Sequence, residues 1–388
     1  MFKKVARLSL FTMVCTWSAF AVTNYPFPQQ YKYSYGILPT GALEAGHRDV
    51  QTVYNVWLKN YYEESGNLAR VKFDKPDTTV SEGIGYGMLI MVYMDNENNK
   101  TQAKFDKLWN YYKAHLDENG LMHWMIQNFT NNAIGQGAAT DAELDVAVAL
   151  IMADKQWGGN YLNEAKALIS KIATHEVSQN MFKGGDRWDA RNPSYMSMVA
   201  TQLFQNISAG SNWGNVQSGC YTLLKNSQSK SSAGLWPNWC DNSGNPGGGV
   251  GPDPGIYGFD ASRTPWRLAW AYTWYGHADA KTMCGNTVTK MTAKIGNNPG
   301  AIGQMYNLDG TLHYSGNETC IPTFLGPLTC AGMVDNTHST WLNNGYTRLR
   351  SYNAKNDNYY NECLELLSML LLTVIWWISQ RCLHVQLL

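Results

Sequence analysis

Charge is scarce in this sequence. Its 388 residues include 30 Lys and Arg against 30 Asp and Glu, so the formal net charge is +0. Charged residues make up only 15%, against about 25% in an average soluble domain. Binding to nucleic acid depends on clustered cationic charge, which this balance does not supply. We therefore expect no nucleic-acid partner.

Several motifs of metal and cofactor chemistry are also missing. The His residues form no His-Glu-x-x-His pair, the Cys spacings fit no zinc site, and no Gly-x-Ser-x-Gly elbow occurs. The glycine run at 247–249 is followed by Pro252 and Pro254, which is unlike a phosphate-binding loop. The sequence thus predicts chemistry that needs no metal and no cofactor.

Linkers and membrane-spanning runs are absent as well. No Ser/Thr/Pro-rich tether or run of like charge divides the chain, so we expect one domain over residues 22–388, acting as a monomer. The apolar stretches at 8–19 and 366–378 are shorter than the ~20 residues of a transmembrane helix. We expect no membrane span.

The first 21 residues are typical of a secretory signal peptide. Lys3, Lys4 and Arg7 give a basic start, an apolar stretch follows, and Ala19 and Ala21 supply a cleavage site. A buried N-terminal helix is the alternative. We predict removal of residues 1–21 and a secreted protein, extracellular or periplasmic.

Cysteine is of limited use for prediction. Secretion permits disulfides, and Cys320 with Cys330 or Cys220 with Cys240 could pair. The connectivity cannot be deduced from the sequence, and the seven cysteines after the signal peptide leave one thiol unpaired within a monomer.

Aromatic residues are abundant, with 15 Trp and 23 Tyr. They fit either a large core or a carbohydrate cleft, in which the apolar faces of sugar rings pack on aromatic planes. Helical periodicity dominates the chain: amphipathic segments occur at 50–61, 105–116 and 162–172, and segments apolar on all sides occur at 83–94 and 144–153. The pattern predicts a two-layer helical architecture with few strands.

Glu82 is the first of three acidic residues in distinctive settings. Thr79 and Glu82 form a capping-box pattern. Yet Gly83, Gly85 and Gly87 follow, and each weakens a helix by about 0.5–1 kcal/mol relative to Ala. Glycines at these positions are explained if another group must approach the helix backbone closely. We favour a catalytic carboxyl whose pKa is raised by apolar surroundings.

Asp141 and Asp260 are the other two. Thr140 and Glu143 form a second capping box around Asp141, and we expect Glu143 to serve that cap; function and capping are equally compatible with Asp141 itself. Asp260 is followed by Arg263 and Arg267, and an adjacent arginine keeps a carboxylate ionised as a base requires. On these residues alone, a structural salt bridge is the favoured interpretation. Thr264-Pro265 is typical of a helix start, with Thr264 as the cap, so Asp260 lies in the loop before it.

Together these segments resemble glycoside hydrolase family 8, and within it the bacterial endoglucanases. The run 139–153 is similar to the family signature, departing at Glu143 and Val146, where the family usually has Asp and Ile or Met. Other matching segments, in the expected order, are 80–88, 120–124, 185–188, 192–195, 234–240 and 259–266. The likeness runs from about Tyr25 to Leu372, after which the tail 374–388 diverges and suggests a frameshift or a docking tail.

The resemblance implies an (α/α)6 barrel with a cleft across one rim and an inverting mechanism. It implies Glu82 as general acid, Asp260 as general base and Asp141 as the residue that holds and distorts the sugar at the cleavage point. It places Tyr195 and Arg263 in support of the acid and the base, and aromatic subsites at Trp124 and Trp188, with Phe259 as a further substrate contact. Inversion needs room for water, so the two carboxyls should be about 6.5–9.5 Å apart.

The predicted activity is endo-hydrolysis of a β-1,4-linked polysaccharide of the cellulose type. A xylanase or mixed-linkage glucanase on the same scaffold is the alternative within this class. A non-hydrolytic glycan-binding protein is the alternative outside it, although binding alone has no use for an acid and base pair. The sequence does not separate digestion of external polymer from processing of cellulose made by the cell.

Overall fold

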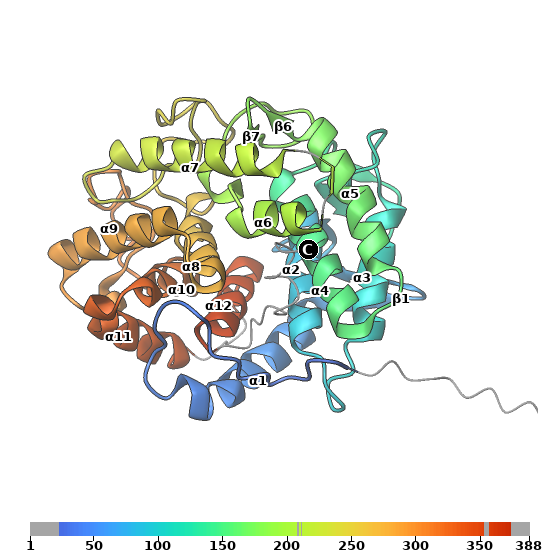
Figure 1. The fold of residues 1–388 in the computed structure, drawn as a ribbon, viewed down its shortest axis with the longest axis horizontal. Helices are drawn as coiled ribbons and strands as arrows, with labels where there is room; N and C mark the ends of the chain where they lie inside the picture. Colours follow the sequence, from blue (N-terminus) through green and yellow to red (C-terminus); the bar gives the residue numbers. More distant parts are fainter. Residues whose placement is uncertain (1–22, 208, 211, 353–356, 374–388) are drawn as a thin grey trace, which may run out of the picture.

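The computed structural model describes residues 23–207, 209–210, 212–352 and 357–373. The predicted signal peptide (1–21), the divergent tail (374–388) and Cys382 lie outside them. The described residues form twelve α-helices, and alternate helices along the chain fall into an inner and an outer group (Figure 1).

The inner group is buried on nearly every side. In α2 every residue except Glu82 is buried, and in α4 the segment from Thr140 to Ala153 is buried without a break. This confirms the prediction from the apolar runs at 83–94 and 144–153. The inner helices are α2 (Ser81–Tyr93), α4 (Thr140–Trp157), α6 (Met198–Asn206), α8 (Thr264–Tyr275), α10 (Pro322–Cys330) and α12 (Tyr359–Leu372).

The outer helices are amphipathic. In α1, for example, Val50, Val53, Tyr54 and Trp57 are buried along one stripe at helical spacing. The amphipathic segments predicted at 50–61, 105–116 and 162–172 belong to this group. The outer helices are α1 (Ala42–Tyr61), α3 (Gln102–Ala114), α5 (Tyr161–His175), α7 (Trp213–Ser229), α9 (Ala278–Ile295) and α11 (Ser339–Arg350).

The inner helices close into a ring. Each contacts the next inner helix along the chain, and α12 contacts α2 to complete the circle. Each inner helix also packs against an outer helix. Five pack on the outer helix that follows them in the chain, namely α2 on α3, α4 on α5, α6 on α7, α8 on α9 and α10 on α11, and the last, α12, packs on the first, α1. The fold is an (α/α)6 barrel, as predicted.

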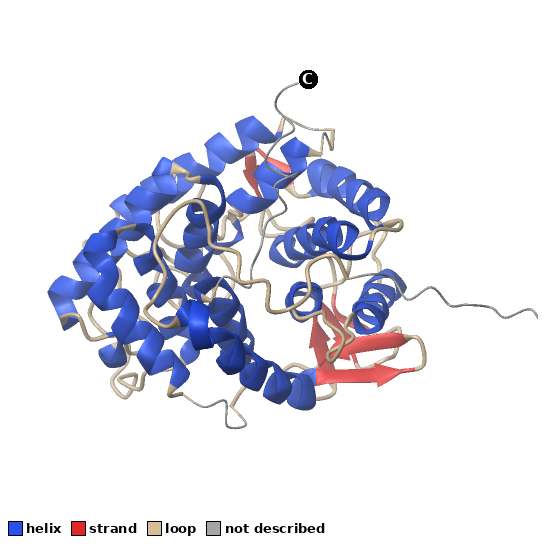
Figure 2. Ribbon diagram, turned by 60° about the horizontal axis from the view of Figure 1, so that its bottom comes forward, coloured by secondary structure: helices blue, strands red, loops and turns tan. Residues whose placement is uncertain are grey.

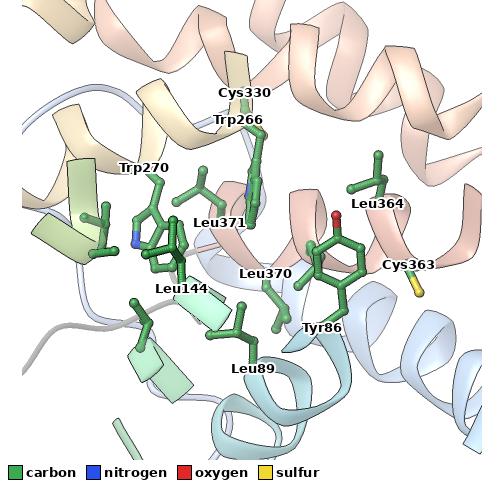
Figure 3. Packing of buried hydrophobic residues seen from close by; sticks show 14 of the residues in the cluster. Tyr86, Leu89, Leu144, Trp266, Trp270, Cys330, Cys363, Leu364, Leu370 and Leu371 are labelled. Carbon is green, nitrogen blue, oxygen red and sulfur yellow. The ribbon is translucent and has the colours of Figure 1, made fainter. Parts of the chain in front are cut away.

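The barrel interior is filled by side chains from opposite parts of the chain. Figure 3 shows Tyr86 and Leu89 of α2 and Leu144 of α4 with Trp266 and Trp270 of α8 and three leucines of α12. All of these side chains are buried. Between successive inner helices, an outer helix leads the chain back to the starting end of the barrel. The inner helices therefore run in the same direction, and their N-termini lie at one rim.

Strands are minor, as expected, and form short antiparallel pieces among the connecting segments (Figure 2). The three-stranded sheet matters most, because it pairs Val80 with Met125 and so places the segment around Trp124 beside the start of α2. The strands are β1 (Tyr62–Ser65), β2 (Leu68–Val71), β3 (Thr78–Val80), β4 (Met125–Gln127), β5 (Ala133–Gly135), β6 (Val177–Ser178) and β7 (Met181–Phe182).

Neither of the two cysteine pairs considered possible is bonded. The six cysteines within the described ranges are all buried free thiols. Cys320 precedes α10 and Cys330 ends it, so about 12 Å of helix separates them, whereas a disulfide needs Cα atoms about 4.4–6.8 Å apart. Cys220 lies within α7, and Cys240 pairs through its backbone with Arg191.

Within the described ranges, no helix is both long enough and apolar enough to cross a membrane.

Candidate active site

The predicted acidic residues come together at the rim formed by the N-termini of the inner helices. Glu82 is the second residue of α2, and Asp141 is the second residue of α4. Tyr195 ends the 3-10 turn η1 (Pro193–Tyr195), which leads into α6. Asp260 precedes the turn η2 (Ala261–Arg263), which leads into α8. Residues far apart in the sequence therefore meet because the inner helices are parallel.

Arg263 is the centre of this cluster. Its side chain is only 1% exposed. Its Nη1 donates to Glu82 Oε2 at 2.5 Å and to Asp141 Oδ2 at 2.5 Å. Asp260 is more distant, with 3.7 Å between its Oδ1 and Arg263 Nη2. One buried cation thus binds two carboxylates directly and faces the third.

This geometry corrects the predicted role of Arg263. The expected ion pair with Asp260 forms, at 3.7 Å, but it does not lower the pKa of that carboxyl overall. Burial instead raises the pKa of Asp260, and the charge of Arg263 and a hydrogen bond from Trp239 only oppose that shift. Arg263 reaches across the barrel to α2 and α4 through Nη1, and along its own segment its Nε donates to the Asp260 backbone carbonyl at 3.3 Å.

Glu82 is the carboxyl best prepared to carry a proton. Burial raises its pKa to about 7, with a further rise from Asp141, while Arg263 pulls in the opposite direction. Its Oε1 accepts a hydrogen bond of 2.9 Å from the Tyr359 hydroxyl. The expected rise in the pKa of Glu82 is confirmed, and its partners are a cation and a phenol.

The glycines after Glu82 permit a close approach, as the sequence suggested. A Cβ at Gly83 would lie 3.1 Å from the Tyr359 hydroxyl. A Cβ at Gly85 would lie 3.1 Å from Asp145 Cβ and 3.2 Å from the Ala142 carbonyl oxygen of α4. Glycine at these positions lets α12 and α4 close around the acid.

Neither capping-box pattern forms a cap, which agrees with the interpretation favoured for Glu82 and contradicts the one given for Glu143. The N-cap of α2 is Val80 and that of α4 is Ala139, and neither helix has a side-chain cap. Glu143 does not serve the cap: it accepts hydrogen bonds from the Tyr112 hydroxyl and the Met122 backbone amide. Both carboxylates form hydrogen bonds with other parts of the structure instead of capping their own helices.

Asp141 is buried at 3% exposure, with one oxygen engaged by Arg263. Its other oxygen, Oδ1, has no hydrogen-bond partner among the described residues. Burial raises the pKa of Asp141, against the opposing charges of Arg263 and Arg267. A buried acceptor of this kind is able to bind a ligand hydroxyl.

The start of α8 differs from the prediction by one residue. Thr264 is the first residue of the helix rather than its cap, and Pro265 follows within the first turn. One turn later, Arg267 forms a bidentate ion pair with Asp145 of α4, at 2.8 and 2.9 Å. Both side chains are only 2% exposed. This pair fixes α8, and with it Arg263, against α4.

Aromatic side chains flank the acidic cluster on one side. Trp124 and Trp188 are partly buried, with ring centroids 6.3 Å apart at an angle of 60°. The Trp124 carbonyl accepts a hydrogen bond from the Ser81 amide, directly before Glu82. The structure therefore brings this predicted aromatic pair to the edge of the site.

Next to the base in the chain, Phe259 is 39% exposed and packs edge-on against Phe324, with centroids 5.3 Å apart. Its carbonyl accepts a hydrogen bond of 2.9 Å from the Tyr360 hydroxyl. Tyr195 is buried, and its ring faces the Arg263 guanidinium at 5.3 Å. All eight predicted site residues thus lie at this rim or beside it.

Sequence reasoning missed three site residues: Trp239, Tyr359 and Tyr360. Trp239 Nε1 donates to Asp260 Oδ2 at 3.1 Å. Tyr359 binds Glu82, and the Tyr360 ring faces Arg263 at 5.9 Å. The two tyrosines are the first residues of α12. Since other site residues also lie at the N-termini of inner helices, their position in the sequence could have identified them. Trp239 lay within the matched segment 234–240.

No group of three or more His, Cys, Asp and Glu suited to a metal ion occurs in the part of the chain that the structure describes.

Comparison with known proteins gives concordant matches. The model of the family described as "Glycosyl hydrolases family 8" matches residues 26–374. A "Beta-glucanase" of Niallia circulans is 32% identical over 385 residues, covering 92% of this chain and 93% of its own. "Endoglucanase A" of Acetivibrio thermocellus is 33% identical, covering 95% and 78%.

A solved structure of a β-1,3-1,4-glucanase from Paenibacillus sp. X4 superposes with a TM-score of 0.86 at 30% identity, covering 92% of this chain and all of that one.

Proposed function

The chain belongs to glycosyl hydrolase family 8, and from this premise we propose that it is an endo-acting hydrolase of β-1,4-glucan with an inverting mechanism. Glu82 is the general acid and Asp260 the general base. The observation that carries the proposal is the rim cluster itself, in which Glu82, Asp141 and Asp260 surround the Arg263 guanidinium. Glycoside hydrolysis requires one carboxyl that gives a proton and another that accepts one.

Glu82 suits the acid role because its pKa lies near 7. At neutral pH a substantial fraction is protonated and able to pass its proton to the glycosidic oxygen as the bond to the anomeric carbon breaks. Its contacts with Arg263 and Tyr359 then stabilise the carboxylate that remains. The protein thus holds the acid before the transfer and its conjugate base after it.

Asp260 suits the base role because its side chain is 42% exposed, which gives water access to the carboxylate. It takes a proton from a water molecule, whose oxygen bonds to the anomeric carbon on the face opposite the leaving group. The anomeric configuration inverts, Asp260 ends protonated, and Glu82 ends ionised. Exchange with solvent restores both groups.

Asp141 and the aromatic residues bind the sugar chain. The free Oδ1 of Asp141 is an acceptor for a sugar hydroxyl next to the cleavage point. Trp124 and Trp188, near the acid, and Phe259, next to the base in the chain, offer apolar planes for the faces of sugar rings. Several aromatic platforms near the acid and the base suit binding of a chain of sugars.

The names of the relatives favour glucan as the substrate, since they include an endoglucanase and two β-glucanases. A mixed-linkage β-1,3-1,4-glucan is the second candidate, because the solved structure with a TM-score of 0.86 is that of a β-1,3-1,4-glucanase. Residues 1–21 fit a signal peptide, and we propose that the protein is secreted and acts as a monomer.

The test is release of reducing ends by the protein from Val22 onward on carboxymethyl cellulose, mixed-linkage β-glucan and xylan. We expect activity on a glucan, with a loss of about 10³-fold or more in kcat for Glu82→Gln and for Asp260→Asn. Binding of cello-oligosaccharides should persist in both variants.

Glu44→Gln and Asp279→Asn are matched controls, because both side chains are exposed on outer helices. They should keep the activity of the unmodified protein. Activity on xylan alone would show that the proposed glucan substrate is wrong. An active Asp260→Asn variant would refute the assignment of Asp260 as the base.

A further inference from the structure

We propose that Trp239 is the positioning residue for the general base: its indole fixes one oxygen of Asp260 so that the other faces the attacking water. This inference rests on the proposed role of Asp260. Its basis is the hydrogen bond of 3.1 Å from Trp239 Nε1 to Asp260 Oδ2. No part of the resemblance assigned a role to Trp239.

Other groups around Asp260 do not supply this constraint. Arg263 Nη2 lies 3.7 Å from Oδ1, and its Nη1 is committed to Glu82 and Asp141. Because Asp260 is 42% exposed, its carboxylate would rotate readily without a fixed donor. An indole N–H donates and cannot accept, so it occupies Oδ2 without competing for the proton that the base must take.

The indole itself is rigidly held. Trp239 is 2% exposed. Its amide donates to the Pro254 carbonyl at 2.8 Å, and its carbonyl accepts from the Gly247 amide at 2.9 Å. The ring packs against two glycines: a Cβ at Gly184 would lie 2.8 Å from Cζ3, and a Cβ at Gly249 would lie 2.0 Å from Cγ. The space around the ring therefore suits glycine only.

The preceding residue fixes the backbone of the same loop. Asn238 Oδ1 accepts hydrogen bonds of 3.0 Å from both the Gly258 and the Ala261 amides, on either side of Asp260. Consecutive residues thus hold the base at two points, Asn238 through the backbone and Trp239 through the carboxylate. A packing role alone would not explain why the indole N–H of Trp239 donates a hydrogen bond to the Asp260 carboxylate.

Trp239 also connects the base to the acid. The Tyr195 ring meets Trp239 edge-on at 5.8 Å, and Arg263 lies over the same Tyr195 ring at 5.3 Å. Since Arg263 binds Glu82, a chain of direct contacts runs from the indole to the acid. The two halves of the site are built as one packed unit.

The test is Trp239→Phe, which removes the N–H and keeps an aromatic ring. The matched control is Trp236→Phe, three residues earlier, whose buried indole donates to the Leu224 carbonyl away from the site. For Trp239→Phe we expect kcat to fall about tenfold or more while KM changes less than about threefold.

The acidic limb of the pH profile should move to higher pH by about half to one unit, because the donor that stabilises ionised Asp260 is lost. Charged groups facing Asp260, namely Arg263 and Glu82, are unchanged by the substitution. Trp236→Phe should leave the pH profile in place. If both variants gave the same kcat and the same profile, Trp239 would be a packing residue only.

Gly249→Ala is a second variant in case Trp239→Phe folds poorly. It keeps the indole but presses on it, and it should lower kcat in the same direction. Asp260→Asn separates the two hypotheses. If Asp260→Asn is inactive while Trp239→Phe matches its control, only the positioning role fails; if Asp260→Asn is active, the proposed base itself is wrong.

Discussion

At Glu82, one carboxyl is adjusted by opposing local effects. Burial and the neighbouring Asp141 raise its pKa, while Arg263 and the Tyr359 hydroxyl lower it, and the balance lies near 7. An acid with a lower pKa would be ionised at neutral pH, and one with a much higher pKa would part with its proton poorly. Tyr359 is therefore expected to affect catalysis without touching the reacting bond.

Tyr359→Phe tests this expectation. Loss of the hydroxyl removes a donor to the ionised carboxylate, so the pKa of Glu82 rises. The alkaline limb of the kcat profile should then move to higher pH by about half to one unit. Tyr352→Phe is the control, since its hydroxyl binds Asp357 instead. A shift to lower pH would contradict the assigned partner.

At the scale of elements, the site depends on how the inner helices are fixed to each other. The Asp145–Arg267 pair joins α4 to α8 and is almost fully buried. Glu143 joins α4 to α3 through the Tyr112 hydroxyl. Burial raises the pKa of Glu143 to about 8, so its carboxyl is mostly protonated at neutral pH. The Asp145–Arg267 pair thus links α4 to α8, and the Glu143–Tyr112 contact links α4 to α3.

Asp145→Asn should lower the free energy of unfolding by about 3–5 kcal/mol, because it leaves Arg267 buried without a counter-charge. The measurement is the urea-induced unfolding midpoint, followed by fluorescence. Asp279→Asn is the control, since its bridge to Lys225 is exposed and should be worth less than about 1 kcal/mol. Equal midpoints for the two variants would show that the buried pair adds nothing.

The sequence predicted some of these elements and misjudged others for physical reasons. The apolar runs predicted α2 and α4 because burial on all sides leaves no polar face. The capping boxes around Glu82 and Glu143 were misleading, since tertiary partners took both side chains. The local partner of Arg263, Asp260, was predicted. Its partner Glu82 was missed because spacing along the chain shows only local neighbours, and Glu82 lies 181 residues away in sequence.

For the whole molecule, the ring of parallel inner helices explains the site. Six helix N-termini at one rim give acidic residues a favourable field and bring together segments from residue 82 to residue 360. Periodicity predicted the helices but not the closure of the ring, which depends on the contact between α12 and α2. The closed (α/α)6 ring and the roles of acid and base were predicted only from the resemblance to a known family.

The central claim is that Glu82 and Asp260 act on opposite faces of the sugar. The most direct measurement is the configuration of the newly formed reducing end, followed by proton NMR in the first minutes of cello-oligosaccharide hydrolysis. Inversion at a β-linkage predicts that the α-anomer appears first and then equilibrates with the β-anomer. Initial formation of the β-anomer would contradict the account, because it requires a covalent intermediate and a nucleophile in place of a base.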